Sequence, residues 1–314
     1  MGRLLAWAAA ALLFALPVRS ADTPVPDARP SDCAAPALQP VPAIERLPAL
    51  PGMRIGLALG SGSIHGLAHI GVIEALEARG VDVKVVAGTS VGALVGGLYA
   101  SGMKGRDIEA MAKTMDLEHM GDFVPSWQGL LHNDDLRERL AEAFGGRPIQ
   151  TWPRRFGAVA SNLDNGMRRV LDSGDGALAV QASTAMPVYF VPVTVNGERL
   201  GDGALVEPVP VRTARELGAD YVIGVDVAYR PYEARASGLL QNGFQAMHIL
   251  VNSLAQTDMR AADFRIRIDA HHTMMECGDE ALVAAGRAAV ARQWPALRRS
   301  LVAAHDGSGT VATQ

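Results

Sequence analysis

Residues 56–72 read GLALGSGSIHGLAHIGV and place a glycine-rich loop between a short apolar run and a helical pattern. The apolar run predicts a strand over 54–59, and the apolar positions after the loop recur at helical spacing until Gly80 ends the helix. A backbone this permissive between a strand and a helix commonly approaches another group closely. The loop therefore indicates a site for a nucleotide phosphate, a site for an oxyanion, or a purely structural turn.

The same alternation of strand and helix patterns continues along the chain to residue 227. Turn signals at Asp164-Asn165-Gly166 and Asn196-Gly197 are typical of hairpins. The predicted fold class is therefore α/β, with three layers in the order α/β/α and a mostly parallel central sheet. Further strands are predicted at 83–87, 155–161, 167–171 and 221–227, and helices at 91–100, 176–185, 209–217, 239–258 and 278–303.

Length and composition limit the organisation and the class of ligand. The chain has 314 residues, of which 49% are hydrophobic, enough for one large domain or two modest ones. A net charge of −4 lacks the electrostatic footprint of a nucleic-acid-binding protein. We expect a main domain at 53–228, a C-terminal helical cover over the sheet at 229–305, and a loose tail at 306–314.

The N-terminal segment differs from the rest of the chain. Arg3 precedes the apolar run Leu4–Val18, and Val18 and Ser20 are placed for cleavage after Ser20. Residues 1–20 are therefore predicted to be a signal peptide, with an uncleaved anchor as the alternative, and the protein is expected to be periplasmic or secreted. No later apolar run is long enough to span a bilayer.

Two further features, the segment 21–52 and the two cysteines, each have two interpretations. Residues 21–52 are rich in proline and predict an extended linker, or a strap lying on the domain. Cys33 and Cys277 could pair in an oxidising compartment, or remain two free thiols.

The sharpest chemical signal is Gly88-Thr89-Ser90-Val91-Gly92, which follows a predicted strand and opens a predicted helix. This is the context of a nucleophile elbow, in which flanking glycines permit a tight turn that exposes the serine oxygen. The helix N-terminus adds a positive dipole end where negative charge would develop. The alternative is a turn without chemistry, because serines between glycines are common.

A nucleophilic serine needs a base and an oxyanion site. Asp202, in Gly201-Asp202-Gly203-Ala204, follows a predicted hairpin and is a candidate base, although an isolated Asp-Gly is more often an ordinary turn. The loop from Gly60 to Gly66 is the candidate oxyanion site, with the amides of Gly62 and Ser63 as its donors.

Taken together, these motifs resemble the patatin-like phospholipase family, in the branch of bacterial members and neuropathy-target-esterase-type domains. The resemblance covers about residues 53–228 and rests on four stretches in one order. These are the glycine-rich loop running into GLAHIGVIEAL, then GTSVGAL, then QASTAMPVYFVPV, and last DGALVEPVPV followed by ARELGADYVIGVDV.

This resemblance implies a patatin-like fold and a serine lipid acyl hydrolase that acts on phospholipids or lysophospholipids at a membrane surface. It implies a Ser–Asp dyad without histidine, in which Ser90 resembles the nucleophile and Asp202, followed by Gly203 and Ala204, resembles the base. It implies neither a metal nor another cofactor.

The loop departs from the family pattern Gly-Gly-Gly-x-Arg/Lys-Gly. Here Ser61 and Ser63 replace two glycines and His65 replaces the basic residue, before Gly66. If a serine position requires a positive φ, each serine costs on the order of 1 kcal/mol. The larger risk is displacement of the oxyanion donors, and His65 could also make the site sensitive to pH.

Three other readings compete with this one. The loop resembles a dinucleotide site, but the second predicted strand runs into the Ser90 turn instead of ending at an acid or Arg. A Ser–Asp–His hydrolase would use His248, His271 or His272. The Ser61 and Ser63 substitutions suggest a catalytically weak or dead lipid-binding protein.

One basic pair also has two interpretations. Arg168 and Arg169, beside the first hairpin, could contact lipid phosphate or could be ordinary charges at an exposed strand end.

Overall fold

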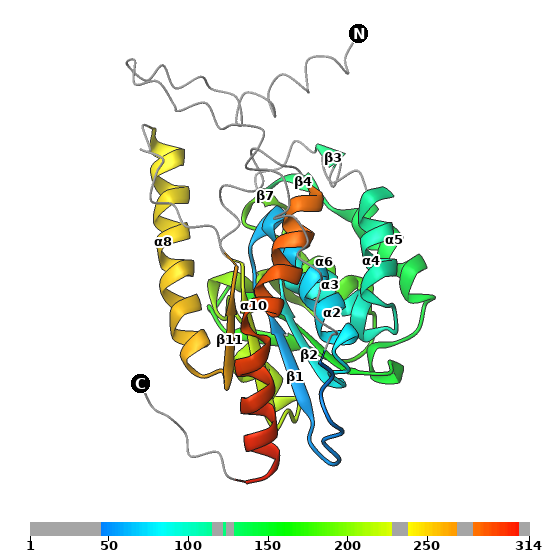
Figure 1. Cartoon of the computed structure of the whole chain (residues 1–314). Coiled ribbons are helices and arrows are strands. Elements are labelled where there is room, and N and C mark those ends of the chain that lie inside the picture. Colours follow the sequence, from blue (N-terminus) through cyan, green and yellow to red (C-terminus); the bar gives the residue numbers. More distant parts are fainter. Residues whose placement is uncertain (1–44, 115–121, 124–128, 228–237, 269–278, 308–314) are drawn as a thin grey trace.

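The computed structural model describes residues 45–114, 122–123, 129–227, 238–268 and 279–307 (Figure 1). The expected signal peptide, Cys33, Cys277, His271 and His272 lie outside the described residues. The last residues of the proline-rich segment contact the domain: Leu47 N donates to Arg79 O at 2.8 Å, and Glu45 pairs with Arg298 at 3.0 Å.

An eight-stranded sheet forms the centre of the fold, in the order β11-β10-β1-β2-β5-β9-β8, with β6 also paired to β5. The first five strands of this order are parallel, whereas β6, β8 and β9 are antiparallel to their neighbours. The mostly parallel sheet expected from the sequence is therefore confirmed. The strands are β1 (Ile55–Leu59), β2 (Val83–Thr89), β5 (Arg155–Asn162), β6 (Arg168–Leu171), β8 (Val193–Val195), β9 (Glu198–Asp202), β10 (Tyr221–Asp226) and β11 (Phe264–Arg267).

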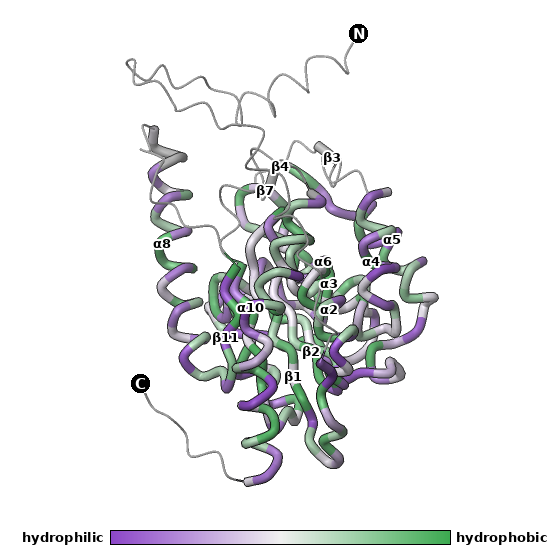
Figure 2. Tube along the Cα trace, in the orientation of Figure 1, coloured by the Kyte–Doolittle hydropathy of each residue, from purple (hydrophilic) through white to green (hydrophobic). Residues whose placement is uncertain are grey.

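Helices lie on both faces of this sheet and bury it completely at its centre. Every residue of β1 and β10 is buried, because successive side chains point into opposite helical layers. Leu57 and Leu59 join one apolar cluster, with α2, α3, α5, α6 and α10, whereas Ala58 joins a second, with α7 and α8. Figure 2 shows the hydrophobic colouring of β1 between these layers.

The helical layers contain seven α-helices of more than eight residues and one shorter helix within the described residues. They are α2 (Leu67–Ala78), α3 (Val91–Ala100), α4 (Gly105–Thr114), α5 (Asp134–Phe144), α6 (Gly176–Thr184), α7 (Val211–Glu216), α8 (Leu239–Arg260) and α10 (Asp279–His305). Short 3-10 turns occur at η2 (Ser63–Gly66), η4 (Ile149–Thr151) and η5 (Gly203–Leu205). A separate small sheet is formed by β3 (Asp122–Phe123), β4 (Gly129–His132) and β7 (Val188–Phe190).

The C-terminal part differs from the purely helical cover that the sequence predicts. The helices α8 and α10 are present, but α10 packs mainly on α2, and β11 adds a parallel strand to the edge of the sheet. Only part of α8 is packed, since Ile249 is 54% and Leu250 65% exposed. The sequence prediction missed β11 because it has four residues, two of them arginine, and so lacks the apolar pattern of the central strands.

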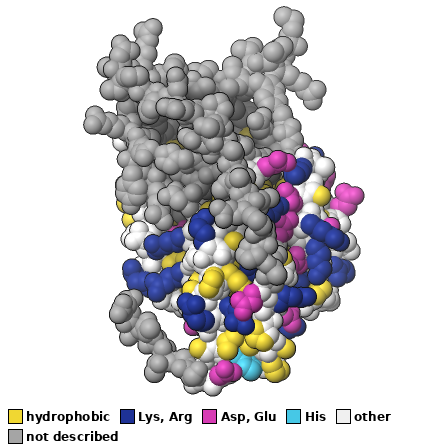
Figure 3. Space-filling model, viewed as in Figure 1, with side chains coloured by type: hydrophobic (Ala, Val, Ile, Leu, Met, Phe, Trp, Pro, Cys, Tyr) yellow, Lys and Arg dark blue, Asp and Glu magenta, His cyan; other side chains and the backbone are white. Residues whose placement is uncertain are grey.

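The surface carries both signs of charge interspersed, as Figure 3 shows for one face of the molecule. Part of this charge is paired: Arg287 of α10 bonds to Glu74 and Glu109, both at 2.6 Å. None of the helices in the described ranges combines the length and the apolar character needed to cross a bilayer.

Candidate active site

Strand register explains why Ser90 and Asp202 meet although they are 112 positions apart. Strand β6 pairs along Ala158–Ser161 of β5 and occupies one edge of that strand. The other edge is shared, first by β2, which ends with Thr89 opposite Val159, and then by β9, which ends with Asp202 opposite Ala160. Because β9 runs antiparallel to β5, the ends of β2 and β9 point toward each other.

Ser90 stands at a strained turn between β2 and α3. Its φ of 57° lies in the left-handed region, which non-glycine residues rarely adopt. Gly88 and Gly92 flank it, and a Cβ on Gly92 would lie 2.1 Å from Leu59 O, so the helix can approach β1 only with glycine there. The Ser90 amide donates to Ser183 Oγ at 3.0 Å, and Ser183 Oγ donates to Val159 O at 2.5 Å. This geometry has the features of a nucleophile elbow.

Asp202 is 1% exposed and receives two hydrogen bonds on its carboxylate. Ser90 Oγ donates to Asp202 Oδ2 at 2.7 Å, and Ala204 N donates to Oδ1 at 2.8 Å. Ser161 Oγ holds the backbone by donating to Asp202 O at 2.7 Å, and Gly203 packs directly against β5. Burial raises the pKa of Asp202 to about 6, although its two hydrogen bonds lower it. A carboxylate with this pKa is ionised at neutral pH and basic enough to take a serine proton.

The glycine-rich loop lies between β1 and α2 and is tied at its start. Gly60 N donates to Val225 O at 3.0 Å, and Ser61 N donates to Pro208 O at 2.8 Å. The next two amides, those of Gly62 and Ser63, have no acceptor among the described residues. Ser63 has a φ of 51°, whereas Ser61 is not in the left-handed region.

This loop packs against the first turn of α3. A Cβ on Gly66 would lie 2.3 Å from both methyl carbons of Val91, the residue after Ser90. Inward from the loop, His69 Nε2 donates to Gly60 O at 2.8 Å, and burial lowers the pKa of His69 to about 4, so its ring is neutral. His65, in the position of the basic residue of the family pattern, is also buried. The C-terminal end of the loop therefore packs on the first turn of α3, the helix that follows Ser90.

The structure thus brings together the two side chains and the loop that the sequence singled out. It adds Ser183 and Ser161, which the sequence analysis did not assign, although Ser183 lies in the quoted stretch QASTAMPVYFVPV. Neither serine has a local sequence signal, because the partner of each is far away in the sequence: Ser90 for Ser183 and Asp202 for Ser161. Arg168 and Arg169 are not free for a ligand: they pair with Glu207 and Glu198 at 3.0 and 2.5 Å.

Comparisons with known proteins show which proteins this chain resembles. Among curated relatives, an NTE family protein of Mycobacterium tuberculosis is 34% identical over 191 residues, which are 60% of this chain and 53% of the relative. Lysophospholipase NTE1 of Yarrowia lipolytica is 32% identical over 184 residues, 57% of this chain but 13% of the relative. The chain therefore spans about half of the first relative and a small part of the second.

Among solved structures, VipD from Legionella pneumophila has the same fold, with a TM-score of 0.51 and 16% identity over 82% of this chain and 67% of VipD. The family model described as patatin-like phospholipase matches residues 57–215, a span that includes the glycine-rich loop, Ser90 and Asp202. The chain belongs to the patatin-like phospholipase family.

Proposed function

We propose that this chain is a serine lipid acyl hydrolase that releases fatty acids from phospholipids or lysophospholipids, with Ser90 as nucleophile and Asp202 as base. The observation that carries the proposal is the 2.7 Å hydrogen bond from Ser90 Oγ to a buried carboxylate, at a turn that holds Ser90 in the left-handed region. The family and the lysophospholipase relative support a lipid ester as the substrate class.

In the proposed reaction, Asp202 takes the hydroxyl proton as Ser90 Oγ attacks the acyl carbonyl carbon. The amides of Gly62 and Ser63 donate to the oxyanion of the tetrahedral intermediate, and the N-terminal end of α3 adds favourable dipole potential. The intermediate collapses to an acyl-Ser90 ester as the protonated Asp202 gives its proton to the departing lipid oxygen. Water, activated by the same carboxylate, then releases the fatty acid and regenerates Ser90.

Direct contact between Ser90 and Asp202 favours a dyad over a Ser–Asp–His triad. In a triad the imidazole lies between the serine and the acid, whereas Ser90 Oγ bonds to Asp202 without an intervening group. His248 is on α8, and His69, on the helix that follows the loop, is bonded to Gly60 O.

Activity-based labelling tests the proposal. A fluorophosphonate should label the folded protein at Ser90, as mapped by mass spectrometry, and lysophosphatidylcholine should be hydrolysed with release of fatty acid. Ser90→Ala and Asp202→Asn should each abolish both signals, whereas the control Ser253→Ala, at an exposed position of α8, should keep them. A wild-type protein that binds lipid vesicles but takes no label would instead favour the lipid-binding reading.

We further propose that the enzyme acts outside the cytoplasm after removal of residues 1–20. Expression of the full chain in a bacterial host, followed by N-terminal sequencing of the exported protein, checks this. A first residue of Ala21 supports the proposal, and an intact N-terminus in the membrane fraction contradicts it.

A further inference from the structure

The segment 207–209, here called the junction segment, binds two of the three loops of the proposed site. Thr89, which precedes the nucleophile, donates from Oγ1 to Glu207 O at 2.8 Å. Ser61, in the glycine-rich loop, donates from its amide to Pro208 O at 2.8 Å. The successive carbonyls of Glu207 and Pro208 therefore accept hydrogen bonds from the nucleophile elbow and from the glycine-rich loop.

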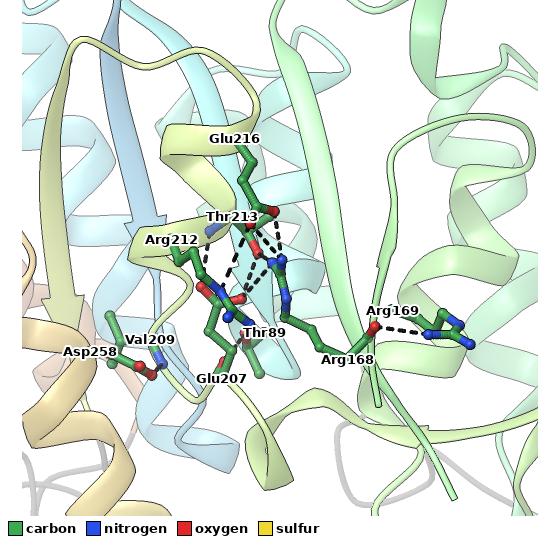
Figure 4. Close-up of polar contacts among 9 residues, drawn as sticks. All are labelled: Thr89, Arg168, Arg169, Glu207, Val209, Arg212, Thr213, Glu216 and Asp258. Atoms are coloured by element: carbon green, nitrogen blue, oxygen red, sulfur yellow. Dashed lines mark hydrogen bonds and ion pairs between the residues drawn. The ribbon is translucent and has the colours of Figure 1, made fainter. Parts of the chain in front are cut away.

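The third loop, the turn after Asp202, is bonded to the same segment. Glu207 N donates to Gly203 O at 3.0 Å, so the junction segment begins where the Asp202 turn closes. At its other end, Val209 N donates to Asp258 Oδ2 of α8 at 3.1 Å. The backbone of the junction segment is thus fixed at both ends and in its middle. Figure 4 shows Val209 beside Asp258 at one of these ends.

The Glu207 side chain anchors the segment in the protein interior. Its carboxylate, 2% exposed, accepts from Thr213 N at 2.9 Å, from Thr213 Oγ1 at 2.6 Å and from Arg168 Nη1 at 3.0 Å. Arg168 in turn donates to both carboxylate oxygens of Glu216, at 2.8 and 2.6 Å. Figure 4 shows this cluster joining the junction segment to α7 and to β6. A buried carboxylate with this many donors has one favoured position.

We propose that Thr89 and Glu207 are positioning residues for the proposed reaction, and that the junction segment sets the distance between Ser90, Asp202 and the loop amides. This inference rests on the proposed function. Thr89, the last residue of β2, is fully buried, and its hydroxyl donates to Glu207 O, 118 positions later in the chain. Without that hydrogen bond, β2 would still pair with β1 and β5, but the residue before Ser90 would lose its link to the Asp202 turn.

A pair of substitutions at Thr89 isolates the hydroxyl. Thr89→Val keeps the branched shape and removes the donor, whereas Thr89→Ser keeps the donor and removes a methyl group. We expect Thr89→Val to lower kcat by roughly tenfold to a hundredfold with KM within about twofold, because small misplacement of reacting groups acts on the chemical step. Thr89→Ser should stay within about threefold of the wild type, and so should the control Thr194→Val, at an exposed position of β8.

A second readout separates positioning from general stability. Ser90 Oγ stabilises the ionised form of Asp202, so a displaced Ser90 should shift the acid limb of the kcat/KM profile of Thr89→Val to higher pH. Glu207→Gln, which weakens the pairing with Arg168, provides an independent variant and should lower kcat in the same way.

The outcomes distinguish this inference from the proposed function. If Thr89→Val and Glu207→Gln both keep the wild-type kcat while Ser90→Ala is inactive, the junction segment has no positioning role and the dyad stands. Equal losses in Thr89→Val and Thr89→Ser would also overturn the inference, because the hydroxyl would not be the cause. If Ser90→Ala retains activity, the proposed function itself fails.

Discussion

Because the Asp202 carboxyl is buried, its ionised form should lower the free energy of unfolding. Asp202→Asn removes the charge and should therefore stabilise the protein. Burial raises the pKa of Asp202 from an ordinary value of 3.8 to about 6. The folded protein therefore binds this proton more tightly than the unfolded chain does. Stability is then unaffected below the unfolded pKa, falls as pH rises from about 4 to about 6, and stays reduced above that range.

The size of the effect follows from the two pKa values. A difference between 3.8 and about 6 corresponds to on the order of 3 kcal/mol at about pH 8, and to roughly half of that at about pH 5. An asparagine at 202 can still accept from Ala204 N and can donate to Ser90 Oγ, so it keeps both contacts without the charge. Asp202→Asn should therefore raise the free energy of unfolding by these amounts while it abolishes ester hydrolysis.

Urea unfolding followed by circular dichroism at both pH values measures this difference directly. Asp172→Asn, at an exposed loop position, is the matched control and should change stability little at either pH. In the wild type the same ionisation should appear in catalysis, as a rise of kcat/KM with pH through a midpoint near 6. An Asp202→Asn variant that is less stable than the wild type at about pH 8 would refute the reasoning, since the carboxylate would then be stabilised by its surroundings.

The glycine-rich loop gives three further predictions. Gly62→Ala should lower kcat in an esterase assay on the order of a hundredfold, because the new Cβ would displace the loop amides. That Cβ would lie 2.7 Å from Val227 Cγ2 and 2.8 Å from Val227 O. An unchanged kcat would argue against the amides of Gly62 and Ser63 as oxyanion donors. Ser63→Gly should raise the free energy of unfolding in urea by up to about 1 kcal/mol, since it relieves a φ of 51°; a decrease would be the contrary result. His69→Leu should lower the free energy of unfolding in urea by about 1–3 kcal/mol, because Gly60 O would lose its buried donor. An unchanged urea midpoint would contradict this prediction.

Local patterns in the sequence were sufficient to predict the elements that hold the site. Strand, elbow and helix at 83–100 all appear within two residues of the predicted bounds, because an apolar run, a glycine-flanked serine and a small-residue helix are each local signals. Two elements that the sequence prediction omitted differ in how much local signal they carry. Helix α5 does carry one, because Leu136, Leu140 and Phe144 recur at helical spacing after two acidic residues, so its omission was avoidable. Strand β11 has no such pattern, and pairing with β10 determines its structure.

The supporting polar contacts could not be predicted in the same way. The sequence offered two readings of Arg168, a phosphate ligand or an exposed strand-end charge, and the structure shows a third, an ion pair with the buried Glu207. That pairing depends on how β6 lies relative to the junction segment, which no local pattern specifies. Ser183 was likewise unassigned, because it lies on α6 and its partner Ser90 lies in the distant turn between β2 and α3.

The two serines of the glycine-rich loop differ in whether their position has a positive φ, and this difference explains how the loop can depart from the family pattern. Ser61 is outside the left-handed region, so a side chain there requires no strained φ. Its amide donates to Pro208 O of the junction segment. Ser63 does require a positive φ, at a cost on the order of 1 kcal/mol, but it is exposed and free of packing constraints. At Gly62 the chain approaches Val227 too closely for any side chain. The loop therefore has glycine where a Cβ would move the proposed donors, and it has serine where the only requirement is a small backbone penalty or none.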